Sequence, residues 1–180
     1  MSWTTPRTWV VGEVLTAANL NTHVRDNLAW AAGASKLTAR VNSTASWTHN
    51  GSGSYRSIDF TEEVWDPAGM HSTSSNNHRL TVPTGGDGKW RVGGCVEWDS
   101  STSGTRTLGV QVNSSDSITG HRVRQQNKAV ASLRQSVHTI TSLAAADYVC
   151  LSALQDSGAN RTVAVGSGYS PHFWAAWDSV

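Results

Sequence analysis

The chain is short of charge. Of its 180 residues only 15% are Asp, Glu, Lys or Arg, and just 3 are Lys. A typical soluble domain carries about 25% charged residues. The formal net charge of +1 excludes a protein that binds nucleic acid through a strongly basic field. We therefore expect no nucleic-acid partner and a surface made largely of uncharged polar residues.

Cysteine is equally scarce. The chain has only Cys95 and Cys150, too few for the disulfide scaffold of a small secreted protein. The N-terminus lacks the basic and then apolar pattern of a secretory signal. We therefore expect synthesis in a cytoplasm, where two free thiols are favoured. A single bridge between the two cysteines is the alternative, and the sequence leaves their redox state open.

Long apolar runs and enzyme motifs are missing as well. No stretch approaches the roughly 18 apolar residues of a membrane span. The chain has no Gly-x-Ser-x-Gly or His-Glu-x-x-His motif, and its 7 histidines are scattered without metal-ligand spacing. We therefore expect no membrane span, no catalytic residues, no metal site and no cofactor. A metal on a symmetry axis is left undecided.

The abundant residues are Ser (24), Thr (19), Gly (16) and Trp (9). After Lys36 the apolar residues alternate with a period of two, most clearly at Trp90, Val92, Val96 and Trp98. Further short segments of this kind, separated by Gly- and Asn-rich turn signals, lie at 58–60, 80–82, 108–112, 133–137, 149–153, 163–165 and 173–177. This pattern predicts a mainly β protein, a sandwich or barrel, with the last segment paired inside a sheet.

The start of the chain follows a different pattern. Thr16 is placed to cap a helix, because its hydroxyl can accept hydrogen bonds from N–H groups of the first turn. Gly33 is a natural stop for that helix. We predict an N-terminal anchor segment over residues 1–36, with one helix over about 16–32, and a β domain over 37–180.

One face of this helix is apolar. Leu20, Val24 and Leu28 recur at helical spacing and form a narrow stripe. A single helix of this length is marginal in water, so it needs a partner surface: its own domain, copies of itself or another protein. Together with Trp3 and Trp9, which lie in the extended segment before the helix, these residues are the predicted anchor.

Parts of the β domain resemble the C1q/TNF-like jelly roll. Residues 58–92 contain an Asp-Pro-Ala-Gly turn, a strand that ends in proline and a Gly-Lys-Trp strand. Residues 143–151 are similar to that family's Gly-Asp-x-Val-x-Leu strand, with Ala146 where glycine is usual, and residues 170–177 resemble its closing strand. The resemblance covers about 40–180. It implies a C1q/TNF-like jelly-roll β-sandwich, preceded by a short extended segment and helix.

Residues 8–28, which begin Thr-Trp-Val-Val-Gly-Glu, resemble the opening of many small virion proteins of tailed bacteriophages. These are minor tail, fibre-like or head-decoration components. The resemblance implies a structural protein on a virion surface, made in the host bacterial cytoplasm. Its N-terminal segment would dock on capsid or tail proteins while the jelly roll projects outward.

The jelly-roll resemblance also implies a homotrimer, because C1q-like domains form trimers through one face of one sheet. The strands at 89–98 and 148–154 are then expected to be neighbours in that sheet. Cys95, Tyr148 and Cys150 would lie on its outer face, toward the threefold axis. Small or weakly polar residues there suit a closely packed interface.

The leading hypothesis is therefore a homotrimeric virion component, either a capsid decoration or a fibre-like protein of the tail or baseplate. The sequence does not decide between these two positions. The alternative is an adhesin that recognises a host-envelope glycan, and the residues that would bind a receptor are unknown. An enzyme that attacks the cell envelope is the least favoured hypothesis, because no motif supports it.

Overall fold

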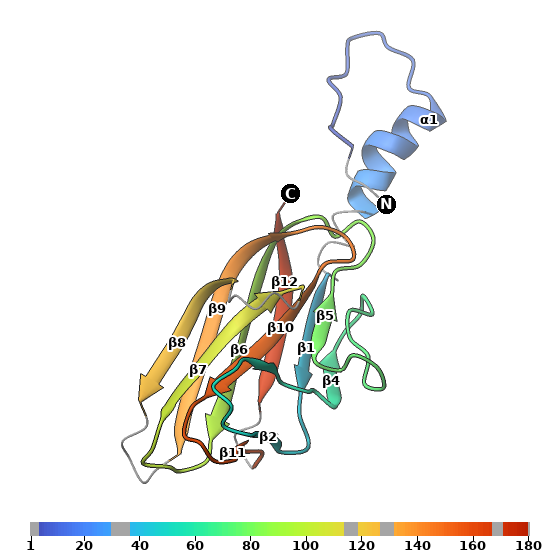
Figure 1. The fold of residues 1–180 in the computed structure, drawn as a ribbon. Coiled ribbons are helices and arrows are strands. Elements are labelled where there is room, and N and C mark those ends of the chain that lie inside the picture. Colours follow the sequence, from blue (N-terminus) through green and yellow to red (C-terminus); the bar gives the residue numbers. More distant parts are fainter. Residues whose placement is uncertain (1–3, 30–36, 114–118, 127–131, 167–170, 180) are drawn as a thin grey trace.

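The structure, a computed structural model, describes residues 4–29, 37–113, 119–126, 132–166 and 171–179. From residue 37 onward the described chain forms two antiparallel sheets that pack face to face. The N-terminal segment stands beyond the end of this sandwich at which the C-terminus also lies (Figure 1).

Sheet A is built around its longest central strand. Within the described residues it has seven strands: β1 (Thr38–Asn42), β2 (Trp47–His49), β4 (Glu62–Trp65), β6 (Gly88–Trp98), β9 (Leu133–Leu143), β11 (Arg161–Val163) and β12 (His172–Ser179). β6 pairs with β9 along one edge and with β12 along the other, and β12 leads on to β1 and β4. β11 pairs with the last residue of β6 and with β2. The C-terminal segment therefore pairs inside the sheet, as predicted.

Sheet B is smaller. Its five strands within the described residues are β3 (Arg56–Ser57), β5 (Arg79–Thr81), β7 (Thr105–Val112), β8 (Thr119–Gln126) and β10 (Tyr148–Gln155). β7 lies between β8 and β10, and the other edge of β10 is shared by β3 and β5. One predicted strand differs. Residues 58–60 follow β3 without belonging to a strand, because this segment crosses from β10 of sheet B to β1 of sheet A: Ile58 N–H donates to Leu151, and Thr61 N–H donates to Asn42.

The core lies between the sheets and contains the alternating residues that the sequence indicates. Trp90, Val92, Val96 and Trp98 on β6 are fully buried. Phe60 stacks on Phe173 with ring centroids 5.7 Å apart. The remaining buried apolar side chains come from both sheets and from the 58–60 crossover, among them Ile58, Leu80, Leu108, Val110, Val149, Leu151 and Val163. The period-two pattern therefore identified the inward faces correctly.

The predicted pairing of two strands is wrong. The strand at 89–98 was expected beside the strand at 148–154, but β6 lies in sheet A and β10 lies in sheet B. Both strands direct their apolar residues into the same core, and a shared core does not require a shared sheet. Their outer faces consequently point to opposite sides of the sandwich.

The turn that precedes β10 contains a strained alanine. Ala146 has φ +71°, a left-handed conformation that costs a non-glycine residue about 1 kcal/mol or more. The turn is fixed by Asp147, whose carboxylate accepts hydrogen bonds from Ala144 N–H at 2.8 Å and from the Asn113 amide at 2.8 Å. These bonds hold the pKa of Asp147 below its usual range.

We expect Ala146→Gly to stabilise the protein by about 0.5 kcal/mol, because relief of backbone strain exceeds the added entropy of the unfolded chain. Thermal unfolding should show a melting temperature about 1–2 °C higher. Ala144→Gly is the control: Ala144 is not among the residues with positive φ, so glycine there should lower the melting temperature. Equal losses in both variants would contradict the prediction.

Candidate functional site

The outer face of sheet A carries a row of aromatic, basic and small residues. The strand register aligns Gly93 on β6 with His138 on β9 and with Trp174 on β12, and it aligns Trp174 with Arg40 on β1. Arg40 in turn pairs with Trp65 on β4, and its guanidinium lies 5.5 Å from the Trp65 ring centroid. Five neighbouring strands thus contribute one side-chain position each to a continuous row.

Gly93 creates the space in which the Trp174 indole lies. A Cβ atom at Gly93 would come within 2.7 Å of Trp174 Cζ2 and within 2.8 Å of the Val137 carbonyl oxygen. The tryptophan ring therefore packs directly on the β6 backbone, which glycine alone permits. This packing keeps the ring flat against the sheet.

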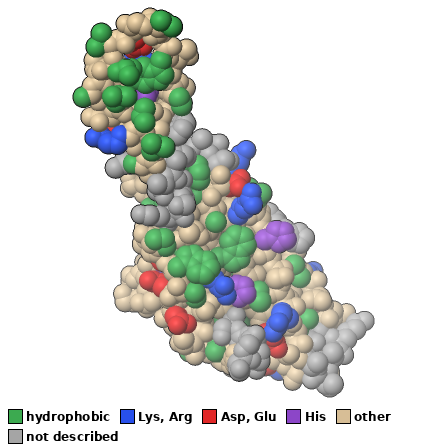
Figure 2. Space-filling model, turned by 180° about the vertical axis from the view of Figure 1, so that it is seen from behind, with side chains coloured by type: hydrophobic (Ala, Val, Ile, Leu, Met, Phe, Trp, Pro, Cys, Tyr) green, Lys and Arg blue, Asp and Glu red, His purple; other side chains and the backbone are tan. Residues whose placement is uncertain are grey.

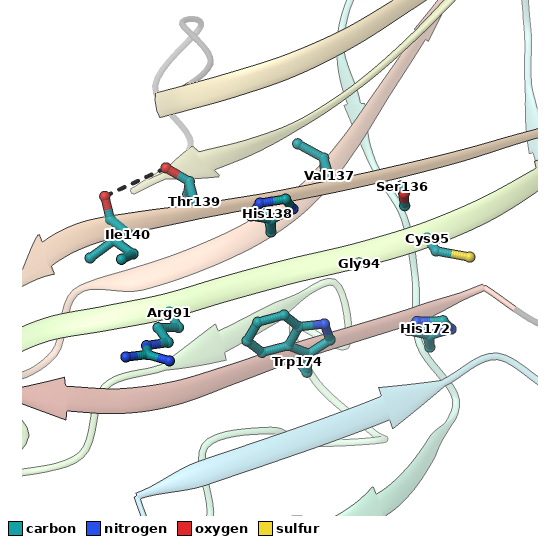
Figure 3. A pocket seen from close by; sticks show the side chains of 10 residues that line it. All are labelled: Arg91, Gly94, Cys95, Ser136, Val137, His138, Thr139, Ile140, His172 and Trp174. Atoms are coloured by element: carbon teal, nitrogen blue, oxygen red, sulfur yellow. Dashed lines mark hydrogen bonds between the residues drawn. The ribbon is translucent and has the colours of Figure 1, made fainter.

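A shallow hollow of about 480 Å³ opens on this face between β9, β6 and β12. Figure 3 shows Trp174 and His138 on either side of β6, with Cys95 and His172 further along the same strands. Ile140 lines one end of the hollow and is 60% exposed. Figure 2 views the molecule from behind. Halfway along the outer surface of the sandwich, apolar side chains lie beside His side chains and basic side chains.

Charged residues at the edges of this face are paired. Arg91 forms an ion pair with Asp178. At the other end of β6, Glu97 accepts hydrogen bonds from Arg134 at 2.7 and 3.0 Å and from Ser132 at 2.7 Å, and these bonds lower the pKa of Glu97. The face therefore has an apolar and aromatic centre that also contains Arg40, with ion-paired charges at its edges.

Of the three residues predicted at a trimer interface, only Cys95 lies on this face. Cys150 is completely buried, so it offers no surface to another chain. Tyr148 lies on sheet B, where its ring is half-buried and packs beneath the Arg79 guanidinium at 4.5 Å. The cause is the strand assignment corrected above, because β10 faces the opposite side of the sandwich.

The two thiols are free, as expected from their small number. Burial raises the pKa of Cys150 to about 11 and also raises the pKa of Cys95. Both thiols are therefore protonated at neutral pH, a state in which they are poor nucleophiles. Among the described residues, no group of three or more His, Cys, Asp and Glu side chains could hold a metal ion.

The N-terminal segment offers a second surface. Its helix begins as predicted, with Thr16 Oγ1 accepting a hydrogen bond from Asn19 N–H at 3.2 Å. It comprises α1 (Ala17–Leu20), the π-helical turn η1 (Asn21–Arg25) and a further α-helical stretch over 26–29. The predicted stop at Gly33 lies outside the described residues.

The polar face of this helix contacts the extended segment before it. Asn27 is 6% exposed. Its side chain accepts from Thr4 N–H at 3.0 Å and donates to the Thr4 carbonyl at 2.8 Å. Trp9 lies edge-on to His23 with ring centroids 6.2 Å apart, beneath the Arg7 guanidinium. The polar side chains therefore hold the segment together from within.

The apolar face is left uncovered. Leu20, Val24 and Leu28 are 41%, 42% and 66% exposed. Most of the large exposed hydrophobic side chains among the described residues belong to this segment, which also carries Val10, Val11, Val14 and Leu15. Figure 2 shows the resulting concentration of apolar side chains at one end of the molecule. Trp9 is 38% exposed, and Trp3 lies outside the described residues.

The row across sheet A was only partly foreseen. The sequence identified Cys95 as outward-facing, but Trp174, His138 and Arg40 were not singled out. The alternation along β9 and β12 could have indicated that these side chains point outward. Their assembly around Gly93 depends on strand order and register, which the alternation does not encode.

Comparisons with known proteins agree with this architecture. No family model matches the sequence, and no curated protein matches it. The globular domain of zebrafish complement 1qA is similar in structure, with a TM-score of 0.56 and 12% identity over 79% of this chain and 98% of that domain. Murine APRIL is also similar, in structures at pH 5.0 and pH 8.0, with TM-scores of 0.55 and 0.54 and 9% identity over 77% of this chain and 95% of that one.

No helix among the described residues is long and apolar enough to cross a membrane. The two antiparallel sheets, their strand pairing and the structural neighbours lead to one conclusion about architecture: the chain has a C1q/TNF-like jelly-roll β-sandwich fold with a short helical segment at its N-terminal side.

Proposed function

We propose that this protein is a structural component of a bacteriophage virion surface, a homotrimer that docks through its N-terminal segment. The observation that carries the proposal is the uncovered apolar face of that segment. Leu20, Val24 and Leu28 are exposed while the polar face of the same helix is used internally. Because Asn27 and His23 already contact the extended segment, the helix presents a preformed apolar surface to a larger partner.

The resemblance of residues 8–28 to virion proteins of tailed phages supports the identity of that partner as a capsid or tail protein. The exposed apolar stripe adds a physical argument for a partner. A contiguous exposed apolar patch on a folded protein marks an interaction site. The sandwich does not supply the cover, because the stripe stays exposed in the presence of every described strand.

The outer face of sheet A supports the trimer. Trp174, Ile140 and His138 surround a hollow in which a neighbouring copy can insert its own apolar side chains. The paired charges of Arg91 and Glu97 at the edges need no partner from another chain. Self-association through this face would bury the apolar centre while the charges of Arg91 and Glu97 stay paired, and Arg40 would keep its contact with the Trp65 ring.

The docking surface is tested by charge substitution. We expect the double variant Leu20→Asp/Leu28→Asp to fold and to keep its oligomeric state, because both side chains are exposed. Its incorporation into virions should fall at least about tenfold, since two carboxylates would be desolvated against an apolar partner surface. Incorporation is measured as copies per purified particle by quantitative mass spectrometry.

Asn19→Asp/Thr22→Asp is the matched control. It adds the same charge to two positions of the same helix outside the apolar stripe, of which Thr22 is exposed and Asn19 half-buried, and it should incorporate normally. If the double leucine variant is present at the wild-type copy number, the N-terminal segment is not the anchor. The wild-type copy number also separates a capsid decoration, present on the scale of the capsid subunits, from a tail or baseplate component present in a few copies.

A further inference from the structure

Buried polar residues gather at the end of the sandwich remote from the N-terminal helix. Figure 1 shows β2 and β11 at this end. Three connections meet here: residues 50–55 between β2 and β3, residues 99–104 between β6 and β7, and residues 156–160 between β10 and β11. We call this region the loop end.

Hydrogen bonds from buried side chains fix these connections. Gln155, fully buried, donates to the carbonyls of His49 at 3.2 Å and Ala159 at 2.6 Å, and its Oε1 accepts from Ser157 N–H at 2.9 Å. His49, also fully buried, accepts from Gly51 N–H through Nδ1 at 3.1 Å and bonds the Ser54 carbonyl through Nε2 at 2.9 Å. These bonds require a neutral imidazole, and burial lowers the pKa of His49 accordingly. The loop end is therefore held in one conformation.

The 99–104 connection packs closely on the neighbouring turn. Gly104 has φ +75°, and a Cβ atom there would lie 2.7 Å from both Cα and N of Ser157. Glycine is thus needed at this position both for its backbone conformation and for the close approach. The contact places the hydroxyl-rich stretch 100–103 in a defined position.

A hollow of about 340 Å³ lies over this stretch. It is lined by Ser100, Ser101, Thr102 and Ser103 and by Arg161 from β11. The Ser101 hydroxyl is within 3.4 Å of the Ser103 carbonyl and accepts from Ser103 N–H at 3.3 Å. The wall of the hollow is therefore polar and carries one cationic side chain.

A second guanidinium lies directly beneath this wall. Arg106 is fully buried, and its Nη1 donates to the Ser103 carbonyl at 3.3 Å and to the Thr105 carbonyl at 3.2 Å. Arg106 Nε and Nη2, as well as Arg161 Nε, are buried donors without a hydrogen-bond partner. A buried donor left unpaired costs about 1–3 kcal/mol, more when the group is charged.

The nearby carboxylates do not satisfy these donors. Asp156 accepts from Thr105 N–H and Oγ1, which lowers its pKa. Asp99 Oδ1 is buried and also lacks a hydrogen-bond partner. Burial lowers the pKa of Arg106, the positive charge of Arg161 lowers it further, and the negative charges of Asp99 and Asp156 raise it. The two carboxylates therefore offset the charge of the guanidinium groups without giving Arg106 Nε, Arg106 Nη2 or Arg161 Nε a hydrogen bond. An anion in the hollow between this loop and β11 would supply Arg161 with the acceptor that neither carboxylate provides.

We propose that the loop end is a binding site for an oxyanion, with Arg161 and the hydroxyl groups of Ser100, Thr102 and Ser103 as direct ligands. The chemical class is a phosphate, sulfate or carboxylate group. Arg161 supplies charge-assisted hydrogen bonds from β11. Arg106 is a positioning residue: it holds the Ser103 carbonyl from below and adds positive potential behind the loop.

The test uses the full-length protein and inorganic phosphate, with sodium chloride at equal ionic strength as the reference. We expect phosphate to raise the melting temperature by about 3 °C at ten times its Kd, because a ligand that binds only the folded state stabilises it. Isothermal titration calorimetry measures the Kd directly. Equal melting temperatures in phosphate and chloride, together with no binding heat, would overturn the proposal.

Substitutions of single arginines test whether phosphate binds at this hollow. Arg161→Gln should weaken phosphate binding at least about tenfold, since it removes the charged donor. Arg161→Lys keeps the charge without the planar fork and should bind with intermediate affinity. Arg122→Gln removes an equal charge from an exposed position on β8 and should bind like the wild type. If Arg122→Gln loses as much affinity as Arg161→Gln, phosphate binds by general charge only and the site is excluded.

The source of the oxyanion is decided by parallel titrations. Sulfate and glucuronate are compared with phosphate as free ions, and then a phosphodiester polymer and a sulfated polysaccharide are compared at equal group concentration. Tighter binding of one polymer than of its free ion, lost in Arg161→Gln, would identify a glycan or polymer ligand. Equal affinity for free ion and polymer would identify a site for small anions.

Discussion

We expect Ile140→Arg to convert the proposed homotrimer into a folded monomer. Ile140 is 60% exposed at one end of the hollow on sheet A, and the strand register aligns it with Arg91. In a trimer joined through this face, each copy would bury an added guanidinium beside an existing one. Burial of an unpaired charge costs several kcal/mol, as much as a central residue contributes to a stable interface.

Sedimentation velocity at micromolar concentration measures the oligomeric state, and circular dichroism shows that the protomer stays folded. Gln125→Arg is the matched control, because it adds the same side chain to an exposed position on β8 of the opposite sheet. It should remain trimeric. A wild-type protein that sediments as a monomer would refute the trimer, and a trimeric Ile140→Arg variant would move the interface to another face.

Trp98→Ala should destabilise the protein by about 3–5 kcal/mol. Trp98 is fully buried, and its indole N–H donates to Gln135 Oε1 at 2.9 Å. Its ring contacts Trp47, with centroids 6.5 Å apart, and lies 5.6 Å from the Arg106 guanidinium. The substitution would leave a large cavity and a buried amide oxygen without its donor. Urea unfolding at equilibrium gives the free energy of unfolding.

Two controls separate these contributions. Trp98→Phe keeps most of the ring but loses the N–H donor, so its loss should be smaller, about 1–3 kcal/mol. Trp65→Ala removes a tryptophan that is 44% exposed, and its loss should be smaller than that of Trp98→Ala because part of the ring already contacts water. A loss for Trp98→Ala no larger than that for Trp65→Ala would mean that Trp98 is not a core residue.

The sequence predicted the inward faces of the strands because buried positions are apolar and alternate with less apolar outward positions. Each strand places successive side chains on opposite faces, so Trp90 and Val92 on β6, or Val149 and Leu151 on β10, reveal the core side without reference to any other strand. The start of the N-terminal helix could also be predicted. Thr16 caps the helix as expected. Ala146 stands where the C1q-like strand usually has glycine, and the structure adds that its φ is positive.

Strand order could not be predicted from the sequence in the same way. β6 and β10 have similar alternation, and two strands with one apolar face can lie side by side or on opposite sheets of a sandwich. The sequence contains no record of which backbone N–H meets which carbonyl. For that reason Cys95 was placed on the correct side of its own strand, while Cys150 was wrongly expected beside it.

The sequence by itself determined the class of fold and the capped amphipathic helix, because each depends on a local period or on a single side chain. Only the tertiary structure decided which polar residues are buried. The sequence shows Arg106 and Arg161 as two ordinary basic residues 55 positions apart. Folding brings them to one end of the sandwich and leaves donors of both side chains buried without a hydrogen-bond partner, which is the observation behind the proposed oxyanion site.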